Sequence, residues 1–380
     1  MAIYVVQSGD TVDSIAAQLQ TPVEDIIYAN QLNYPYPLAV GQALLILETD
    51  VLQQDKRMIN VNGYAYPYIN EKVLQTTLPY LTELSVFSYG FTVSGEVIYP
   101  SRDDTFMIEA AKQFGTGAVL TLTPIDESGR FNNNLISELV RDDNAITNLI
   151  QNLLVVISQK GFIGVDVDFE YIKAEDRDLF TAFVARLRSE LNCLGYRVSV
   201  ALAPKTSSDQ RGLLYEGKDY AGLGEAANSV LLMTYEWGYK YSQPMAVAPI
   251  NKVRQVVEYA VTQIPVEKID LGIPNYGYDW PLPYVKGETA ATTIGNIQAV
   301  EIAVANGAVI QFDEIAQSPF FNYTLDGVDH EVWFEDVRSM NAKFDLINEY
   351  NLRGAGYWQI MRLFLANWLL LESRFNIRKI

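Results

Sequence analysis

Eight short apolar segments alternate with amphipathic stretches through most of the chain, and this alternation constrains the fold more than any other feature. The segments lie near residues 61–66, 84–91, 117–123, 162–170, 197–203, 229–235, 269–275 and 354–358. Most of the stretches between them have apolar residues at helical spacing, as in LFTAFVARLRSEL at 179–191. Strands that alternate with helices pair in parallel, because each helix returns the chain to the same end of the sheet. Eight such units predict an α/β fold, with the strands closed into a TIM (β/α)8 barrel.

The barrel segment is longer than a plain barrel requires. A plain barrel takes about 250 residues, whereas the predicted barrel domain spans 61–380. Most of the surplus lies between Tyr276 and Gly354, so we predict a small α+β insertion at about 280–335, between the seventh and eighth strands. The apolar stretch at 363–371 is far shorter than the roughly 20 residues of a spanning helix. It is expected to be a closing helix packed on the core.

The N-terminal 48 residues have a separate pattern. Residues 3–6 and 43–47 are typical of strands, and two short helical stretches lie between them. Asp10 or Thr11 can cap the first helix, and Pro22 suits the first turn of the second. The polar stretch at 49–60 is predicted to be a linker, so that the small β-α-α-β module and the barrel are separable.

Charge and composition exclude several classes of function. Lys and Arg number 28 and Asp and Glu 46, giving a formal charge of −18. Such an acidic chain does not bind nucleic acid or an anionic membrane by charge. A single cysteine, Cys193, and a single histidine, His330, exclude a disulfide framework and a Cys- or His-rich metal centre. We expect no metal and no cofactor. The N-terminus has neither the basic nor the apolar region of a secretory signal, so no signal peptide is predicted.

The fourth strand segment contains the residues most suited to catalysis. It reads GFIGVDVDFEY at 161–171, with Asp166, Asp168 and Glu170 at every second position. In a strand these side chains share one face, about 6.6 Å apart per step. The alternative is an ordinary polar face in water, but a central barrel strand is covered on both sides. Burying three unpaired carboxylates costs several kcal/mol each, which a fold tolerates where their repulsion raises pKa values for acid–base chemistry.

Residues 1–48 resemble the LysM module. The match comprises V-x-x-G-D-T-x-x-x-I-A at 6–16, T-x-x-x-x-I at 21–26 and L-x-V-G-Q-x-L-x-I at 38–46. The resemblance implies binding of glycans that contain N-acetylglucosamine, such as peptidoglycan and chitin, between the loops at 9–12 and 30–36. It makes four residues candidate glycan contacts: Gly9, Asp10, Thr11 and Asn30. The alternative is that Gly9 and Asp10 serve only the turn and the helix cap.

The fourth strand resembles the D-G-x-D-x-D-x-E signature of glycoside hydrolase family 18. The positions that match are Gly164, Asp166, Asp168 and Glu170. Ile163 replaces the first Asp of the signature, at the position furthest from the scissile bond, so activity is still expected. What the replacement does not support is a direct transfer of chitinase specificity.

Two further strand ends extend this resemblance. LLMTYEWGY at 231–239 is similar to the family motif M-x-Y-D, with Tyr235 in place and Glu236 instead of Asp. Trp358, in GYWQI, matches the tryptophan that forms the floor under the −1 sugar. Simple core packing is the alternative for Trp358 and for Met233.

The family resemblance implies a retaining, substrate-assisted mechanism. Glu170 is then the acid that protonates the leaving oxygen and later activates water. Asp168 orients the acetamide N–H, and Asp166 raises the proton affinity of Asp168 by repulsion. Tyr235 donates a hydrogen bond to the acetamide carbonyl. The remaining candidates for substrate contact are Asp166, Tyr276, Trp358 and Glu236.

Further segments resemble the bacterial spore branch of this family, which combines LysM with the barrel. They include 201–220, 235–250 and 272–283. The resemblance implies cleavage of N-acetylglucosaminyl bonds in spore-cortex fragments during germination, in the coat and cortex region of the spore. The expected partners are peptidoglycan strands or muropeptides, and a monomer is expected. Three alternatives remain: an endo-chitinase, an inactive glycan-binding member of the family, and a structural protein of the spore coat.

Overall fold

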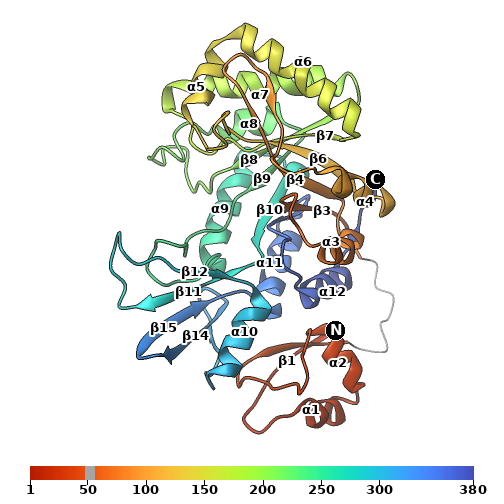
Figure 1. The fold of residues 1–380 in the computed structure, drawn as a ribbon, viewed down its shortest axis with the longest axis vertical. Helices are drawn as coiled ribbons and strands as arrows, with labels where there is room; N and C mark the ends of the chain where they lie inside the picture. Colours follow the sequence, from red (N-terminus) through yellow and green to blue (C-terminus); the bar gives the residue numbers. More distant parts are fainter. Residues whose placement is uncertain (48–55) are drawn as a thin grey trace.

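The computed structural model describes residues 1–47 and 56–380, and within the second range eight parallel strands close into a barrel (Figure 1). Each strand pairs with its two neighbours, and β3 closes the ring by pairing with both β4 and β16. In spatial order the strands are β3 (Met58–Ala65), β4 (Glu83–Phe91), β6 (Gly117–Leu122), β7 (Gly164–Val167), β8 (Arg197–Leu202), β9 (Ser229–Leu232), β10 (Ile269–Pro274) and β16 (Gly354–Trp358). The predicted α/β barrel is confirmed.

Helices surround the barrel because each connecting segment has one apolar stripe that packs on the strands. They are α3 (Glu71–Thr77), α4 (Thr105–Gln113), α5 (Asn134–Arg141), α6 (Asp143–Lys160), α7 (Arg177–Asn192), α8 (Tyr220–Ala226), α9 (Ile250–Gln263), α11 (Val337–Glu349) and α12 (Leu365–Arg374). Short 3-10 turns are η1 (Leu78–Tyr80), η2 (Ala174–Asp176) and η3 (Val266–Lys268). The closing helix α12 buries Trp368 in the main core, as expected. No helix among the described residues is long and apolar enough to cross a membrane.

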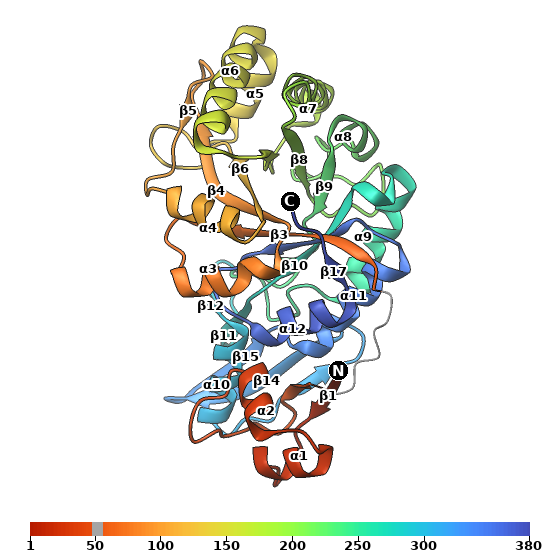
Figure 2. The same ribbon diagram turned by 90° about the vertical axis from the view of Figure 1, so that its right-hand side faces the viewer.

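The bottom of the barrel is sealed by the C-terminal residues. The short strand β17 (Asn376–Ile377) pairs in parallel with β3 (Figure 2). At the other end of the barrel, a short strand, β5 (Val97–Ile98), forms a hairpin with the last residues of β4. Ile163 precedes β7 at the bottom of the barrel, packed beside Gly117, and Ile380 covers the same glycine. The family's first Asp position is therefore apolar where the barrel is closed, away from the open end.

A five-stranded antiparallel sheet with one helix is inserted between β10 and β16, which confirms the predicted α+β insertion. Its elements are β11 (Gly277–Leu282), β12 (Thr292–Ile294), α10 (Asn296–Ala305), β13 (Gln311–Asp313), β14 (Ser318–Leu325) and β15 (Val328–Trp333). The insertion begins at once after β10, and Asn275 and Tyr276 are the two residues that connect the barrel to this sheet. In Figure 1 the insertion lies below the barrel at lower left, beside the N-terminal module at lower right.

The N-terminal module has the predicted β-α-α-β order. It comprises β1 (Ala2–Val5), α1 (Val12–Leu19), α2 (Val23–Ala29) and β2 (Ala43–Ile46), with β1 and β2 antiparallel. Thr11 caps α1, and Pro22 is the N-cap of α2. Residues 49–55 of the predicted linker lie outside the described residues. Its end is different from the prediction, because β3 already begins at Met58.

The module is packed against the barrel and the insertion rather than separate from them. Leu45 belongs to the main apolar core, and Ala39 packs with the core of the insertion. Backbone groups join the two parts: the Ile310 N–H donates to Val40 O at 2.9 Å. The Gln31 amide oxygen accepts from the Leu365 N–H at 2.6 Å. The periodicity of the sequence does not predict this interface. The apolar residues of a small module are expected to lie in its own core, and nothing in the pattern marks those that contact another domain.

We expect Gly41→Ala to loosen this docking. Gly41 has φ +83°, and a Cβ there would lie 1.8 Å from the carbonyl oxygen of Ile310. Gly9 has a similar φ of +91° but nothing within 4 Å, so Gly9→Ala carries the backbone strain without the clash. Overpacking typically costs about 1–3 kcal/mol, so Gly41→Ala should melt at a clearly lower temperature than Gly9→Ala. Equal melting temperatures for the two variants would mean that the contact with Ile310 contributes nothing.

Candidate active site

The three carboxylates of the fourth barrel strand lie at its C-terminal end, although the strand is shorter than predicted. β7 ends at Val167, and Asp168 and Glu170 follow it in extended chain. The Asp168 N–H still donates to Leu122 O at 2.9 Å, so the chain stays against β6 beyond the last strand residue. The neighbouring Phe169 points into the main core. The alternation therefore continues, and the acidic side chains stay on the barrel's inner side.

Asp166 lies deepest and does not line the cavity. Its carboxylate accepts hydrogen bonds from the hydroxyls of Tyr64 on β3, at 2.8 Å, and Ser199 on β8, at 2.6 Å. Burial raises the pKa of Asp166, and the two hydrogen bonds oppose that rise. Asp166 thus lies deeper in the barrel than Asp168 and does not reach the cavity. Its use as a direct substrate contact, expected from sequence, has no support in this position.

Asp168 is buried with one oxygen unsatisfied. The residue is only 8% exposed, and its buried Oδ1 has no hydrogen-bond partner among the described residues. Burial is the main cause that raises the pKa of Asp168 well above its usual value, and repulsion by Glu170 and then Asp166 adds to it. A free buried acceptor next to a second acid is costly unless something donates to it. Asp168 is therefore suited to share a proton with its neighbour or to accept one from a ligand N–H.

Glu170 is half-buried and faces the cavity. Burial raises its pKa, and the nearby ammonium of Lys218 opposes the rise. A carboxylic acid with a raised pKa that borders open space can donate a proton to a bound ligand. The position of Glu170 is the one that a general acid requires.

These acids open into a cavity of about 600 Å³ at the C-terminal end of the strands. Its walls are rich in aromatic side chains. Trp358 lies edge-on to Phe87, at 4.8 Å between ring centroids, and to Tyr66, at 6.1 Å. The lining residues are Tyr66, Phe87, Phe131, Asp168, Glu170, Tyr171, Pro204, Leu214, Tyr215, Met233, Tyr235, Glu236, Trp237, Tyr239 and Trp358. Aromatic faces beside a few convergent polar groups suit a sugar ring.

Tyr235 and Glu236 follow β9, which is separated from β7 by one strand, β8. Burial and the nearby carboxylates raise the pKa of Tyr235 well above its usual value, so its hydroxyl keeps its proton. Glu236 has φ +66° and keeps a face open to the cavity. Its carboxylate accepts from the hydroxyls of Tyr276 and Tyr278, the latter at 3.0 Å. Tyr276 is 3% exposed and does not line the cavity, so it holds Glu236 rather than meeting a ligand directly.

Three partners of the acids were missed by the sequence interpretation: Tyr64, Ser199 and Lys218. Each comes from a different strand or loop, at positions without a distinctive pattern. The segment that contains Lys218 supported a family resemblance, but nothing in it marks this lysine as buried beside the acids. Among the described residues, no group of three or more His, Cys, Asp or Glu is placed to hold a metal ion.

Comparison with known proteins agrees with this geometry. The sequence model of the glycosyl hydrolases family 18 matches residues 128–362, and the LysM domain matches residues 4–46. The chain belongs to glycosyl hydrolase family 18. It is therefore a glycosidase, and Ile163 and Glu236 are departures within the family rather than signs of another fold.

Relatives of this family 18 enzyme match over its whole length. It is 36% identical to the cortical fragment-lytic enzyme of Bacillus subtilis, over 100% of this chain and 99% of the relative. It is also 36% identical to the putative sporulation-specific glycosylase YdhD of the same organism, over 100% of this chain and 89% of the relative. The crystal structure of the Bacillus megaterium spore cortex-lytic enzyme SleL superposes with a TM-score of 0.93, at 33% identity, covering 100% and 99% of the two chains.

The candidate glycan contacts of the LysM domain in this family 18 enzyme differ in how free they are. Thr11 accepts from the Ser14 N–H at 3.1 Å as a helix cap. Asp10 accepts from the Tyr4 hydroxyl at 2.8 Å. Asn30 is 7% exposed, and its amide bonds three backbone groups of the module. Asn30 therefore has a structural role, whereas the turn at Gly9 remains open to solvent.

Proposed function

We propose that this enzyme hydrolyses N-acetylglucosaminyl bonds in peptidoglycan fragments of the bacterial spore cortex, in the spore during germination. The observation that supports this most is the pair of acids, buried Asp168 and half-buried Glu170, which open into an aromatic cavity in a chain that matches cortex-lytic relatives from end to end. The ligands would be glycan strands or muropeptides.

The proposed reaction is retaining and uses the 2-acetamido group of the sugar as nucleophile. Glu170 donates its proton to the glycosidic oxygen while the acetamide oxygen bonds to the anomeric carbon, and the bond to the leaving sugar breaks. The unsatisfied Oδ1 of Asp168 accepts the acetamide N–H and stabilises the positive charge of the oxazolinium ring. Tyr235 donates its hydroxyl hydrogen to the acetamide oxygen. Water then attacks the anomeric carbon, and the bond from this carbon to the acetamide oxygen breaks, which opens the ring and restores the acetamido group. Glu170, now a carboxylate, takes the proton of the attacking water.

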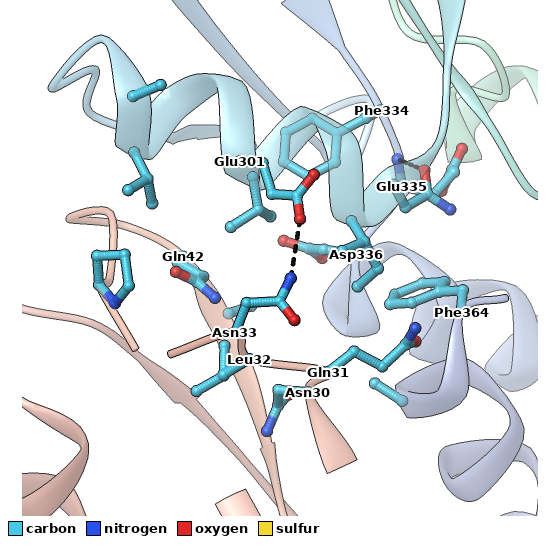
Figure 3. A pocket seen from close by; sticks show the side chains of 18 residues that line it. Asn30, Gln31, Leu32, Asn33, Gln42, Glu301, Phe334, Glu335, Asp336 and Phe364 are labelled. Atoms are coloured by element: carbon cyan, nitrogen blue, oxygen red, sulfur yellow. Dashed lines mark hydrogen bonds between the residues drawn. The ribbon is translucent and has the colours of Figure 1, made fainter. Parts of the chain in front are cut away.

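The LysM domain is proposed to bind the same polymer and hold the enzyme on insoluble material. Gly9 and Thr11 in its first loop are exposed, whereas the loop at 30–36 contacts helix α12 of the barrel through Gln31 and helix α10 of the insertion through Asn33, which donates to Glu301 (Figure 3). Glycan would then meet a module already fixed in orientation to the catalytic cavity. This gives each bound strand a defined position relative to Glu170.

The experiment is digestion of purified cortex fragments, followed by mass analysis of the new reducing ends and by NMR of the first anomer formed. We expect N-acetylglucosamine at the new reducing end, first released as the β-anomer. Turnover of chitin oligosaccharides alone would indicate an endo-chitinase instead. Binding without any turnover would indicate a glycan-binding protein of the spore coat.

Trp358→Ala should weaken binding of N-acetylglucosamine oligosaccharides by about 1–3 kcal/mol, by analogy with aromatic stacking on flat ligands. The ring of Trp358 is fixed by Tyr64, Tyr66 and Phe87, so it is presented to a ligand in one orientation. Calorimetric titration of an inactive Glu170→Gln protein, with and without Trp358→Ala, measures the loss. Trp358→Phe keeps a ring and should lose less. Unchanged affinity in the alanine variant would assign Trp358 to core packing alone.

A further inference from the structure

A lysine is buried directly behind the two catalytic acids. Lys218 is 0% exposed, and its ammonium donates to the carbonyl oxygen of Phe169, the residue between Asp168 and Glu170. It also donates to Ala201 O at 3.2 Å and lies 5.2 Å from the ring centroid of Phe180. No salt bridge to Lys218 is formed among the described residues. A buried ammonium that bonds only carbonyl groups is costly for stability.

The loop that contains Lys218 packs directly against the segment that follows Asp168 and Glu170. Gly217 approaches so closely that a Cβ there would lie 2.2 Å from the carbonyl oxygen of Ile172. A second buried lysine, Lys205, fixes the same loop by donating to the carbonyl oxygen of Lys218 at 2.9 Å. The position of the Lys218 ammonium is therefore set by contacts on both sides.

The charges that surround the acids come from several elements. The groups that face Asp168 and Glu170 are Asp166, Tyr64, Tyr66, Tyr171, Tyr235, Glu236 and Lys218. Lys218 is the only cation in that set. Burial lowers the pKa of Lys218 to about 8, while the attraction of Asp168 and Glu170 opposes the fall, so the ammonium is charged at acidic and neutral pH.

We propose that Lys218 is a positioning residue, which holds the chain between Asp168 and Glu170 by its carbonyl group and keeps a fixed positive charge behind both acids. Without it, the ionised forms of two adjacent buried carboxylates would face only anions and hydroxyls. This inference rests on the acid–base roles proposed for Asp168 and Glu170, and it does not depend on which glycan is the substrate.

The test compares Lys218→Met, which is uncharged, with Lys218→Arg, which keeps a charge. A charge a few ångströms from a carboxylate changes its pKa by about one to three units. Removing the cation raises the pKa of both acids, so both limbs of the pH profile of kcat/KM should move to higher pH by about one unit in Lys218→Met. Lys218→Arg should keep the limbs within a few tenths of the wild type. Should Lys218→Met fail to fold, Lys218→Gln is the second uncharged variant.

Lys205→Met is the matched control, because it removes a buried lysine from the same loop. The charged groups around Lys205 are Arg177, Asp219 and Asp209, not the catalytic acids. We expect it to lower the melting temperature without moving the pH limbs. Equal movement of the limbs in Lys205→Met and Lys218→Met would show a general loosening of the loop and would overturn the proposal.

A measurement without turnover separates this inference from the proposed function. In the full chain labelled with 13C at the Asp carboxyl groups, the Asp168 signal is identified by its loss in Asp168→Asn. Its NMR titration should move to higher pH in Lys218→Met. An unmoved titration in a folded variant contradicts the role of Lys218. Absence of hydrolysis by the wild type would instead contradict the proposed function, and the titration would still test Lys218.

Discussion

Glu170→Gln is expected to reduce turnover at least about 10²-fold while the protein stays folded, because glutamine has the shape of the acid but cannot donate its proton. Glu170 and Asp168 are the two carboxylic acids of this chain segment that border the cavity. Since burial already favours the neutral form of Glu170, a neutral amide in its place should not disturb the packing. Initial rates on soluble fragments and the melting temperature measure the two halves of this prediction.

Glu175→Gln is the control for this substitution. Glu175 lies in η2, five residues further along, with a mostly exposed side chain that pairs with Arg141 at the surface. Its rate and melting temperature should stay close to those of the wild type, since exposed ion pairs contribute little. More than about a tenth of wild-type activity in Glu170→Gln would remove Glu170 from the role of general acid.

Asp168→Asn should also lose most of its rate, with oligosaccharide binding largely kept. The amide can still meet an acetamide group, but it cannot become the anion that stabilises a positively charged ring. It also ends the repulsion by Glu170 that raises the pKa of Asp168, so the single remaining acid loses its proton at a lower pH than the last proton of the pair does in the wild type. The basic limb of the pH profile then moves to lower pH, opposite to the direction expected for Lys218→Met.

Titration calorimetry beside kinetics distinguishes the roles of Asp168. Asp178→Asn is the matched control, because Asp178 on α7 is almost fully exposed and pairs with Arg177 at 3.5 Å. Loss of binding together with loss of rate in Asp168→Asn would make the residue structural. Retained binding with a rate near that of the wild type would show that the anion of Asp168 is not what stabilises the charged intermediate.

The docking of the LysM domain also bears on how its role is tested. Deletion of residues 1–47 removes Leu45 from the main core and uncovers apolar surface on α12 and the insertion. Such a deletion changes stability and glycan binding together. Point substitutions at the exposed residues Gly9 and Thr11 leave the interface intact, so they test attachment to insoluble peptidoglycan more cleanly.

Patterns along the chain were enough to predict the fold class, the order of the elements and the three acids that share the inner face of the fourth strand. Strands that alternate with helices, and acids at every second position of one strand, are local patterns with a fixed spatial meaning. The LysM module and the insertion were likewise recognisable, because each has its own apolar period and its own turns. β7 ends earlier than predicted, but these conclusions still hold because the extended chain continues past Val167.

The groups that surround the acids and the placement of the module could be found only from the folded chain. Tyr64, Ser199 and Lys218 are 102, 33 and 49 residues away from their respective contacts on the acidic segment. Tyr276 and Asn30, expected to meet ligands, instead hold Glu236 and the backbone of β2. A pattern along the chain records the face on which a side chain lies, but not what is folded against that face. Closure of the barrel and docking of the module supply those contacts, because they bring together segments that share no local period.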